Sequence, residues 1–371
     1  MNLLKKISNL STLLSIPHSI SHSISHSISH SIPQQVYPGI FVIKQGGIFG
    51  AFRPPINIYL LAGSDGIIFD AGYGQRLSAS YVAREIKKIG SLYKSNGTPF
   101  KITRILVSHN HPDHFSGLAL LRKYLGVKVV LTRKIANMLK SKHSFASNFY
   151  PTNKQMYYKK NSLRGLVNKL LHLIYPLLFG ITVMPDPDQI IDDNDNAEIS
   201  INEERWIIFH SPGHASGHIS LYNAQKGILL AGDNVLRVIH TWLGPPDSNI
   251  DTYIETLKRY LLLPKLELIL SAHGSPITDC HRRIKQLIDH RDRRAKLVFD
   301  IICSSGKEGI TMESILKELY PRQGIVKQEL ARGWIALTID SLLKKSLIKN
   351  HHDKNSRLFS SCNKLMSAKI T

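Results

Sequence analysis

The chain has 371 residues, a formal net charge of +21 and 43% hydrophobic residues. This length is more than one core usually serves, so two folded domains are expected. The three cysteines are widely spaced, which excludes a disulfide framework and indicates a reducing, cytoplasmic compartment, or a mitochondrial one for a eukaryotic chain. The positive charge indicates an anionic partner but does not choose between nucleic acid, lipid and a small anion.

Residues 1–35 are expected to be a low-complexity segment without fixed structure. They contain no acidic residue, and the repeat "HSISHSISHSISHSIP" places a histidine at every fourth position. The first sixteen residues predict a short basic amphipathic helix. They lack the apolar stretch and the cleavage site of a secretory signal, and they are poor in arginine for a mitochondrial presequence.

From Val36 onward, predicted strands and helices alternate along the chain. "GIFVIK", "INIYLLAG" and "GIIFDAG" predict strands, "SASYVAREIKKIG" a helix, and "ITRILVS" a buried strand. The helix "GLALLRKYLG" and the strand "VKVVLT" follow. After an interruption the alternation resumes with "WIIFH", "GILLAG", the helix "IDTYIETLKRYLLL" and "LELILSAH". This order predicts an α/β domain, at 36–303, whose sheets are covered by helices.

An insert at about 141–185 interrupts that alternation. Its apolar stretch "LRGLVNKLLHLIYPLLFGI" is too short and too broken, by Pro176 and Gly180, to predict a membrane span. A helix packed on its own domain is the favoured interpretation; a cap over a substrate cleft and a surface helix on lipid headgroups are the alternatives. Residues 115–185 also lack any acid, so they form either a solvated basic face, balanced by the acidic segment 186–204, or an anion-binding surface.

The pattern changes again after "SSG" at 304–306. "TMESILKELY" and "ELARGWIALTIDSLLKKSLI" predict two helices, and "KNHHDKNSRLFSS" predicts a polar hairpin. This order is typical of a small α+β winged-helix domain, placed at 306–371. Such a domain can bind nucleic acid, cover the core or mediate a homodimer.

Seven imidazole and carboxylate groups follow predicted strands. Four lie in the loop "SHNHPDHFSG" and the others in "SPGH", "AGD" and "SAHG". Ligands gather at the ends of strands in α/β proteins, and this donor set suits Zn²⁺, with iron or manganese as alternatives. Seven groups are too many for one tetrahedral ion, so two ions are predicted, with Asp233 as the natural bridge. The seven are His109, His111, Asp113, His114, His214, Asp233 and His273.

The motifs "FDAG", "SHNHPDH", "SPGHASGH", "AGD" and "SAHG", over about 40–277, resemble the metallo-β-lactamase superfamily on its glyoxalase II-like branch. The resemblance implies a four-layer αβ/βα sandwich with a dinuclear site at its edge. It implies that His109, His111 and His214 hold one ion, that Asp113, His114 and His273 hold the other, and that Asp233 bridges them. The C-terminal region resembles the subgroup of lactamase-beta-like protein 2, a mitochondrial endoribonuclease. "HFSG" and "SAHG" depart from the commoner family patterns without removing a ligand.

The expected reaction is hydrolysis by a metal-bridging hydroxide, with Asp113 holding the nucleophile and passing a proton to the leaving group. The first hypothesis for the substrate is a small anionic thioester, ester or lactone. The second is single-stranded RNA or another phosphodiester, which the net charge and the C-terminal domain favour. A non-enzymatic metal-binding protein is a third class. Asp70, His218 and His240 are candidates for supporting the site or contacting substrate, each beside a purely structural interpretation.

Overall fold

A computed structural model of the protein describes residues 33–46, 53–149, 175–193, 197–321, 325–353 and 356–361. Nearly all of the predicted low-complexity segment and the middle of the predicted insert lie outside the described residues. None of the described helices is long and apolar enough to cross a membrane.

Two sheets form the centre of the fold. The first has seven strands in sequence order, and the second has five in the order β12-β11-β10-β9-β8. The first sheet is formed by β1 (Gln34–Tyr37), β2 (Ile40–Gln45), β3 (Ile56–Leu61), β4 (Gly66–Phe69), β5 (Ile102–Leu106), β6 (Lys128–Thr132) and β7 (Gln189–Ile191). The second is formed by β8 (Ala197–Ile201), β9 (Glu204–His210), β10 (Ile219–Asn223), β11 (Ile228–Gly232) and β12 (Leu268–Ser271).

The central strands β3, β4 and β11 are largely apolar and fully buried, because both faces of each sheet are covered there. In β3, Ile58 and Leu60 join the core beneath one set of helices, whereas Tyr59 and Leu61 join the core between the sheets. Alternation is also seen in β11, where Leu230 faces the core between the sheets and Leu229 faces another set of helices. The pleat of each strand therefore serves two cores.

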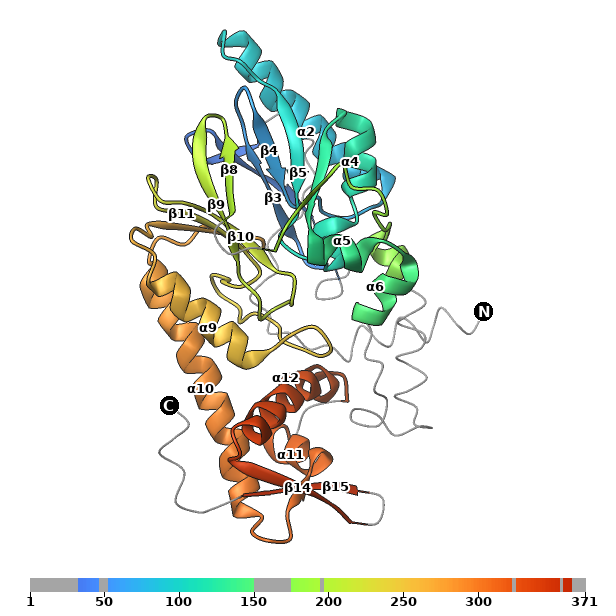
Figure 1. Cartoon of the computed structure of the whole chain (residues 1–371), viewed down its shortest axis with the longest axis vertical. Helices are drawn as coiled ribbons and strands as arrows, with labels where there is room; N and C mark the ends of the chain where they lie inside the picture. The colour runs from blue at the N-terminus through green and yellow to red at the C-terminus, as the bar shows by residue number, and fades with distance from the viewer. Residues whose placement is uncertain are drawn as a thin grey trace. The chain divides into compact units, whose positions relative to one another are not determined.

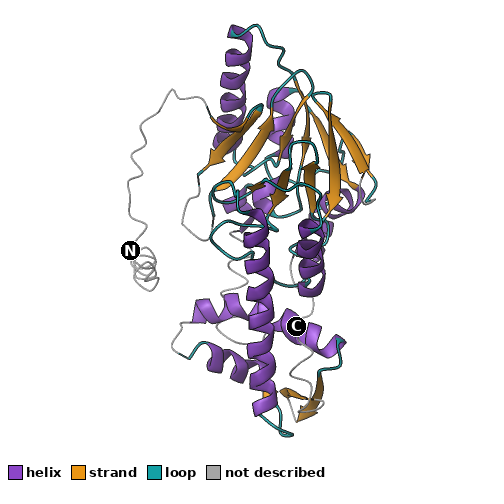
Figure 2. Cartoon of the chain, turned by 90° about the vertical axis from the view of Figure 1, so that its left-hand side faces the viewer, coloured by secondary structure: helices purple, strands orange, loops and turns teal. Residues whose placement is uncertain are grey.

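Helices complete the outer layers (Figure 1). α2 (Arg76–Ser95), α4 (Leu118–Leu125) and α5 (Arg133–Leu139) cover the first sheet, and α9 (Ile250–Leu261) and the first part of α10 (Cys280–Ser304) cover the second. Helix, sheet, sheet and helix are thus stacked in the four-layer order expected from the sequence. In Figure 2, coloured by secondary structure, the strands of the two sheets lie together with helices outside them.

The described ends of the insert pack on the core. Phe145 in α6 (Lys142–Phe149), Phe179 and Met184 are buried, and the Gly74 amide donates to the Phe179 carbonyl. This agrees with the packed-helix interpretation for those parts; the apolar stretch at 163–174 lies outside the described residues. The basic residues before it are partly balanced by the acidic segment, as Arg122 pairs with Asp188 at 2.9 Å.

Beyond the sandwich, α10 continues into a third sheet and two helices. These are β13 (Ile310–Thr311), α11 (Met312–Leu319), α12 (Ile325–Lys344), β14 (Ile348–Asp353) and β15 (Ser356–Ser361). They share a core with Val298, Phe299 and Ile302 of α10. Both predicted helices and the hairpin are present; the winged-helix assignment and the domain boundaries stay predictions. α12 is joined to α9 by Asp251, which accepts from Ser341 Oγ at 2.7 Å.

Candidate functional site

The seven predicted ligands meet at one end of the sandwich, and they come from both sheets. His109, His111, Asp113 and His114 follow β5 of the first sheet, the last two within the short helix α3 (Pro112–Phe115). His214, Asp233 and His273 follow β9, β11 and β12 of the second sheet. The strand ends that carry these residues therefore belong to two sheets rather than to one. The site joins two edges because the face-to-face packing of the sheets aligns their ends.

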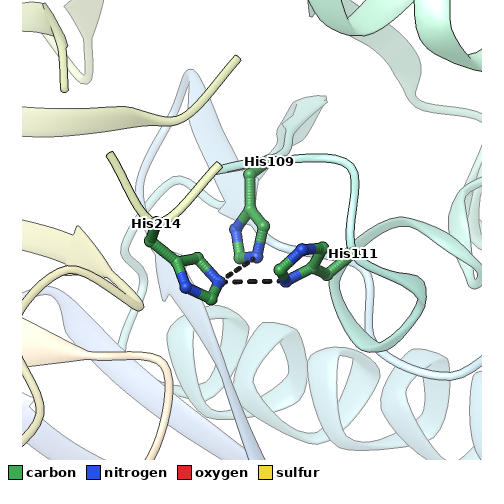
Figure 3. A group of neighbouring side chains, drawn as sticks. All are labelled: His109, His111 and His214. Atoms are coloured by element: carbon green, nitrogen blue, oxygen red, sulfur yellow. Dashed lines mark hydrogen bonds between the residues drawn. The ribbon is translucent and has the colours of Figure 1, made fainter. Parts of the chain in front are cut away.

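His109, His111 and His214 point toward one another (Figure 3). His214 Nε2 lies 3.2 Å from His109 Nε2 and 2.9 Å from His111 Nδ1. Two nitrogens bound to one tetrahedral zinc lie about 3.3 Å apart, given Zn–N bonds of about 2.0–2.1 Å. The trio therefore has the spacing of nitrogen ligands around one cation.

Burial keeps this trio neutral. Desolvation lowers the pKa of His111 and of His214 to about 4, and it lowers the pKa of His109 well below its ordinary value. At neutral pH the three imidazoles therefore carry no charge. Neutral imidazole is the form that binds metal ions.

The other side of the centre is rich in carboxylates. His273 Nε2 lies 3.5 Å from Asp113 Oδ2, and His114 Nε2 lies 3.8 Å from the same oxygen. Burial opposes charge here, but Asp70, Asp113 and Asp233 outweigh it and raise the pKa of His114 to about 9. Asp233 and Asp113 likewise raise the pKa of His273 well above its ordinary value, against the effect of burial. These carboxylates require nearby positive charge, which a divalent cation also supplies.

Asp233 lies between the two groups. Its Oδ1 is 3.6 Å from His114 Nε2 and 3.4 Å from His273 Nε2, whereas its Oδ2 is 3.5 Å from His214 Nε2. Asp233 Oδ1 and His114 Nε2 are both buried, and neither has a hydrogen-bond partner among the described residues. A buried polar atom left unpaired costs about 1–3 kcal/mol. A divalent cation would satisfy both atoms, so the donor set fits a metal centre.

The outward-facing nitrogens of these histidines are fixed by further contacts. His114 Nδ1 is 2.9 Å from Asp70 Oδ2, and His109 Nδ1 is 2.9 Å from Ser108 Oγ. Ser108 also donates its backbone amide to Asp70 Oδ1 at 2.7 Å. Asp70 thus orients His114 directly and holds the loop through Ser108. These contacts fit the interpretation in which Asp70 supports the site.

Two backbone carbonyls orient His214 and His273. His214 Nδ1 contacts the Trp242 carbonyl at 2.8 Å, and His273 Nδ1 contacts the Pro55 carbonyl at 2.6 Å. These contacts leave Nε2 of both rings directed at the centre. Sequence reasoning missed them, because any residue carries a carbonyl; Ser108 could have been suspected from its place beside His109.

Of the two other candidate histidines, His218 stacks on the ring of His109 with centroids 5.1 Å apart, and His240 lies in the loop after β11. His218 is fully buried, and its Nε2 accepts from the Asp233 amide at 3.2 Å while its Nδ1 contacts Ser211 Oγ at 2.8 Å. It therefore fixes the backbone that carries Asp233 and has no nitrogen left for a substrate. His240 is exposed, and its ring stacks on His290 of α10 with centroids 3.4 Å apart.

Comparison with known proteins agrees with this geometry. The family model of the metallo-beta-lactamase superfamily matches residues 52–273, and the chain belongs to that superfamily. The chain is 26% identical to the probable metallo-hydrolase YflN of Bacillus subtilis, over 57% of this chain and 76% of that protein. It is 25% identical to the acyl-coenzyme A thioesterase MBLAC2 of Gallus gallus, over 63% of this chain and 77% of that one.

Solved structures show the same fold. A metallo-beta-lactamase family protein from Thermus thermophilus superposes with a TM-score of 0.68 at 19% identity, covering 88% of this chain and all of that one. The family match, the metallo-hydrolase relative and the His/Asp cluster identify the protein as a hydrolase of this superfamily whose cluster can bind metal, as the sequence predicted.

Proposed function

We propose that this protein is a dinuclear metal-dependent hydrolase of a small anionic thioester, with esters and lactones as related substrates. One observation carries the proposal: the two oxygens of Asp233 face different histidine groups, at 3.4–3.6 Å on one side and 3.5 Å on the other. A carboxylate in that position can bridge two ions. His109, His111 and His214 would hold one, and Asp113, His114 and His273 the other, with zinc favoured over iron and manganese by the histidine-rich set.

When bound, such an ion pair activates a water molecule and takes up charge that develops on the substrate oxygen. The chain's own residues position the reactants. Asp113 is buried, yet His114 and His273 lower the pKa of its carboxyl group, so it is ionised at neutral pH. It can therefore accept a hydrogen bond from the attacking water, but it is a weak proton donor.

That weakness favours a leaving group that departs without a proton. A thiol has a pKa of about 8.5, far below that of an alcohol, so a thiolate leaves more readily than an alkoxide. The thioesterase relative supports the same substrate class. Phosphodiester cleavage of RNA is the second candidate, which the net charge of +21 favours.

Metal analysis and a substrate panel test the proposal. We expect close to two zinc ions per chain after gentle purification. We also expect turnover of an acyl-coenzyme A or acyl-glutathione thioester, with weaker turnover of a lactone and none of single-stranded RNA or a model phosphodiester. If the protein cleaves RNA and the Asp233→Asn variant does not, the nuclease function would replace thioester hydrolysis as the proposal. A metal-free protein that takes up no zinc would contradict the site itself.

A further inference from the structure

A second group of imidazoles and cationic side chains lies outside the metal centre. The rings of His240 and His290 stack nearly parallel, with an interplanar angle of 15°. His240 is in the loop that connects β11 to α9, and His290 is in α10. Neither ring has a hydrogen-bond partner among the described residues, so the nitrogens of both are available to a ligand.

Four arginines of α10 act electrostatically on this histidine pair: Arg283, Arg291, Arg293 and Arg294. Arg291 is buried, and the Arg294 guanidinium lies over the Trp334 ring at 4.3 Å. None of the four forms an ion pair with a carboxylate in the part of the chain that the structure describes. Arg283 donates to the carbonyls of Leu236 and Ile239, at 2.6 and 2.8 Å, and Arg291 donates to the Thr241 carbonyl. These contacts fix the loop, but a carbonyl does not neutralise a guanidinium charge.

The result is a concentration of arginines without an ion-pair partner among the described residues. Burial, then the neighbouring His240 and then the arginines lower the pKa of His290 to about 3, and burial followed by the arginines lowers the pKa of His240. Like charges gathered in one place raise the free energy of the protein, and an anion would remove that cost. The planar forks of arginine match phosphate oxygens especially well, and histidine adds further donors.

The position relates the group to the reaction. His240 is two residues from Trp242, whose carbonyl contacts the ligand His214, so the Cα atoms of His240 and Trp242 lie within about 7.6 Å of each other. The side chains of Val238 and Ile239 in the same loop are exposed, as is half of Trp242. An apolar group and an anionic group of one molecule could therefore contact this loop while the scissile bond reaches the metal centre.

We propose that His240, His290 and these arginines of α10 form a subsite for a phosphate monoester, which binds the phosphorylated end of the thiol part of the substrate. This inference rests on the proposed thioesterase function for its role in catalysis, but the binding of phosphate does not. The expected substrate class is an acyl thioester of a phosphorylated, nucleotide-like thiol.

Binding is tested on the full chain with inorganic phosphate as the probe. NMR of the histidine ring signals should show His240 and His290 shifting on addition of phosphate and their pKa values rising, because an anion favours the protonated ring. His281, exposed on the same helix, serves as the internal control and should not move. Acetate should shift the two rings less than phosphate. The subsite would be refuted if His281 shifted as much as His240 and His290, or if neither His240 nor His290 shifted.

Variants connect binding to catalysis. Arg293→Gln and His290→Gln should each raise KM for an acyl-coenzyme A about tenfold and leave kcat nearly unchanged, with no effect on a short thioester that lacks phosphate. Arg282→Gln is the matched control, because Arg282 is on the same helix but is paired with Asp279. Equal effects on both thioesters would contradict the subsite. Phosphate binding without any thioester turnover would instead contradict the proposed function. If the variants lose more activity on RNA than on an acyl-coenzyme A, the subsite would be assigned to a polynucleotide.

Discussion

Asp233→Asn is the sharpest test of the metal centre, because it removes one charge and almost no volume. The Asp233 oxygens lie 3.4–3.6 Å from Nε2 of His273, His114 and His214. The negative charge of Asp233 and one positive charge about 3.5 Å away attract each other by about 5 kcal/mol at an effective dielectric constant of about 20. A loss of that size corresponds to a drop in metal affinity on the order of 10³-fold or more.

We therefore expect the Asp233→Asn variant to retain at most one ion per chain and to lose nearly all hydrolysis. The assay is metal content after dialysis against a weak chelator, followed by turnover at saturating zinc. Circular dichroism should remain that of the unmutated protein, since the amide fits the same space. A variant that keeps two ions and its full activity would refute the bridging position of Asp233.

The surroundings of the site give three further predictions. Asp70→Asn should weaken metal binding or activity by about 10–100-fold, because it loosens His114, whereas Asp65→Asn, which breaks an ion pair with Arg104, should change neither; equal losses would contradict this. Gly232→Ala should abolish metal binding, because Gly232 has φ +50° and an added Cβ would lie 2.5 Å from His218 Nε2. The control Gly97→Ala, at φ +66° in open space, should cost only about 1–2 kcal/mol of stability. In the metal-free protein, the melting temperature should fall from about pH 6.5 toward 4, since the unfolded chain takes up protons that buried His111 and His214 refuse. It should also fall from about pH 6.5 toward 9, where the stabilising proton on His114 is lost. A melting curve without the alkaline fall would contradict the charge assigned to His114.

Much of the fold could be predicted because its causes are local in the sequence. The strand "INIYLL" is apolar at every position but one, which predicts burial on both faces, and β3 is indeed buried throughout. The helix "IDTYIETLKRYL" begins after Asn249, whose side chain accepts from the Thr252 amide, as an N-cap does. The partition of strands between two sheets is set by long-range packing and was supplied by the family resemblance alone.

The grouping of the seven candidate ligands could also be predicted, because each residue closely follows a strand that has a clear apolar pattern. The supporting contacts could not. The carbonyls of Trp242 and Pro55 reach His214 and His273 only through the folding of loops that are distant in the sequence. For the basic stretch, the sequence left open a solvated face balanced by the acidic segment and an anion-binding surface. Arg122 and Arg133 pair with aspartates of that segment, as the first of these interpretations expects.

The charge on the two sides of the centre is unequal, so we expect their affinities for a cation to depend differently on pH. His109, His111 and His214 are neutral, so a cation bound there gains no full charge of opposite sign except from Asp233. Asp113, with Asp233 beside it and Asp70 behind His114, makes the other side anionic, and protons on His114 and His273 hold that charge in check. A cation held on the anionic side would have to displace those protons, so we expect its affinity to rise with pH up to about 9. The histidine side would have no such competition above about pH 4, so we expect it to retain an ion in mildly acidic solution after the anionic side has lost one.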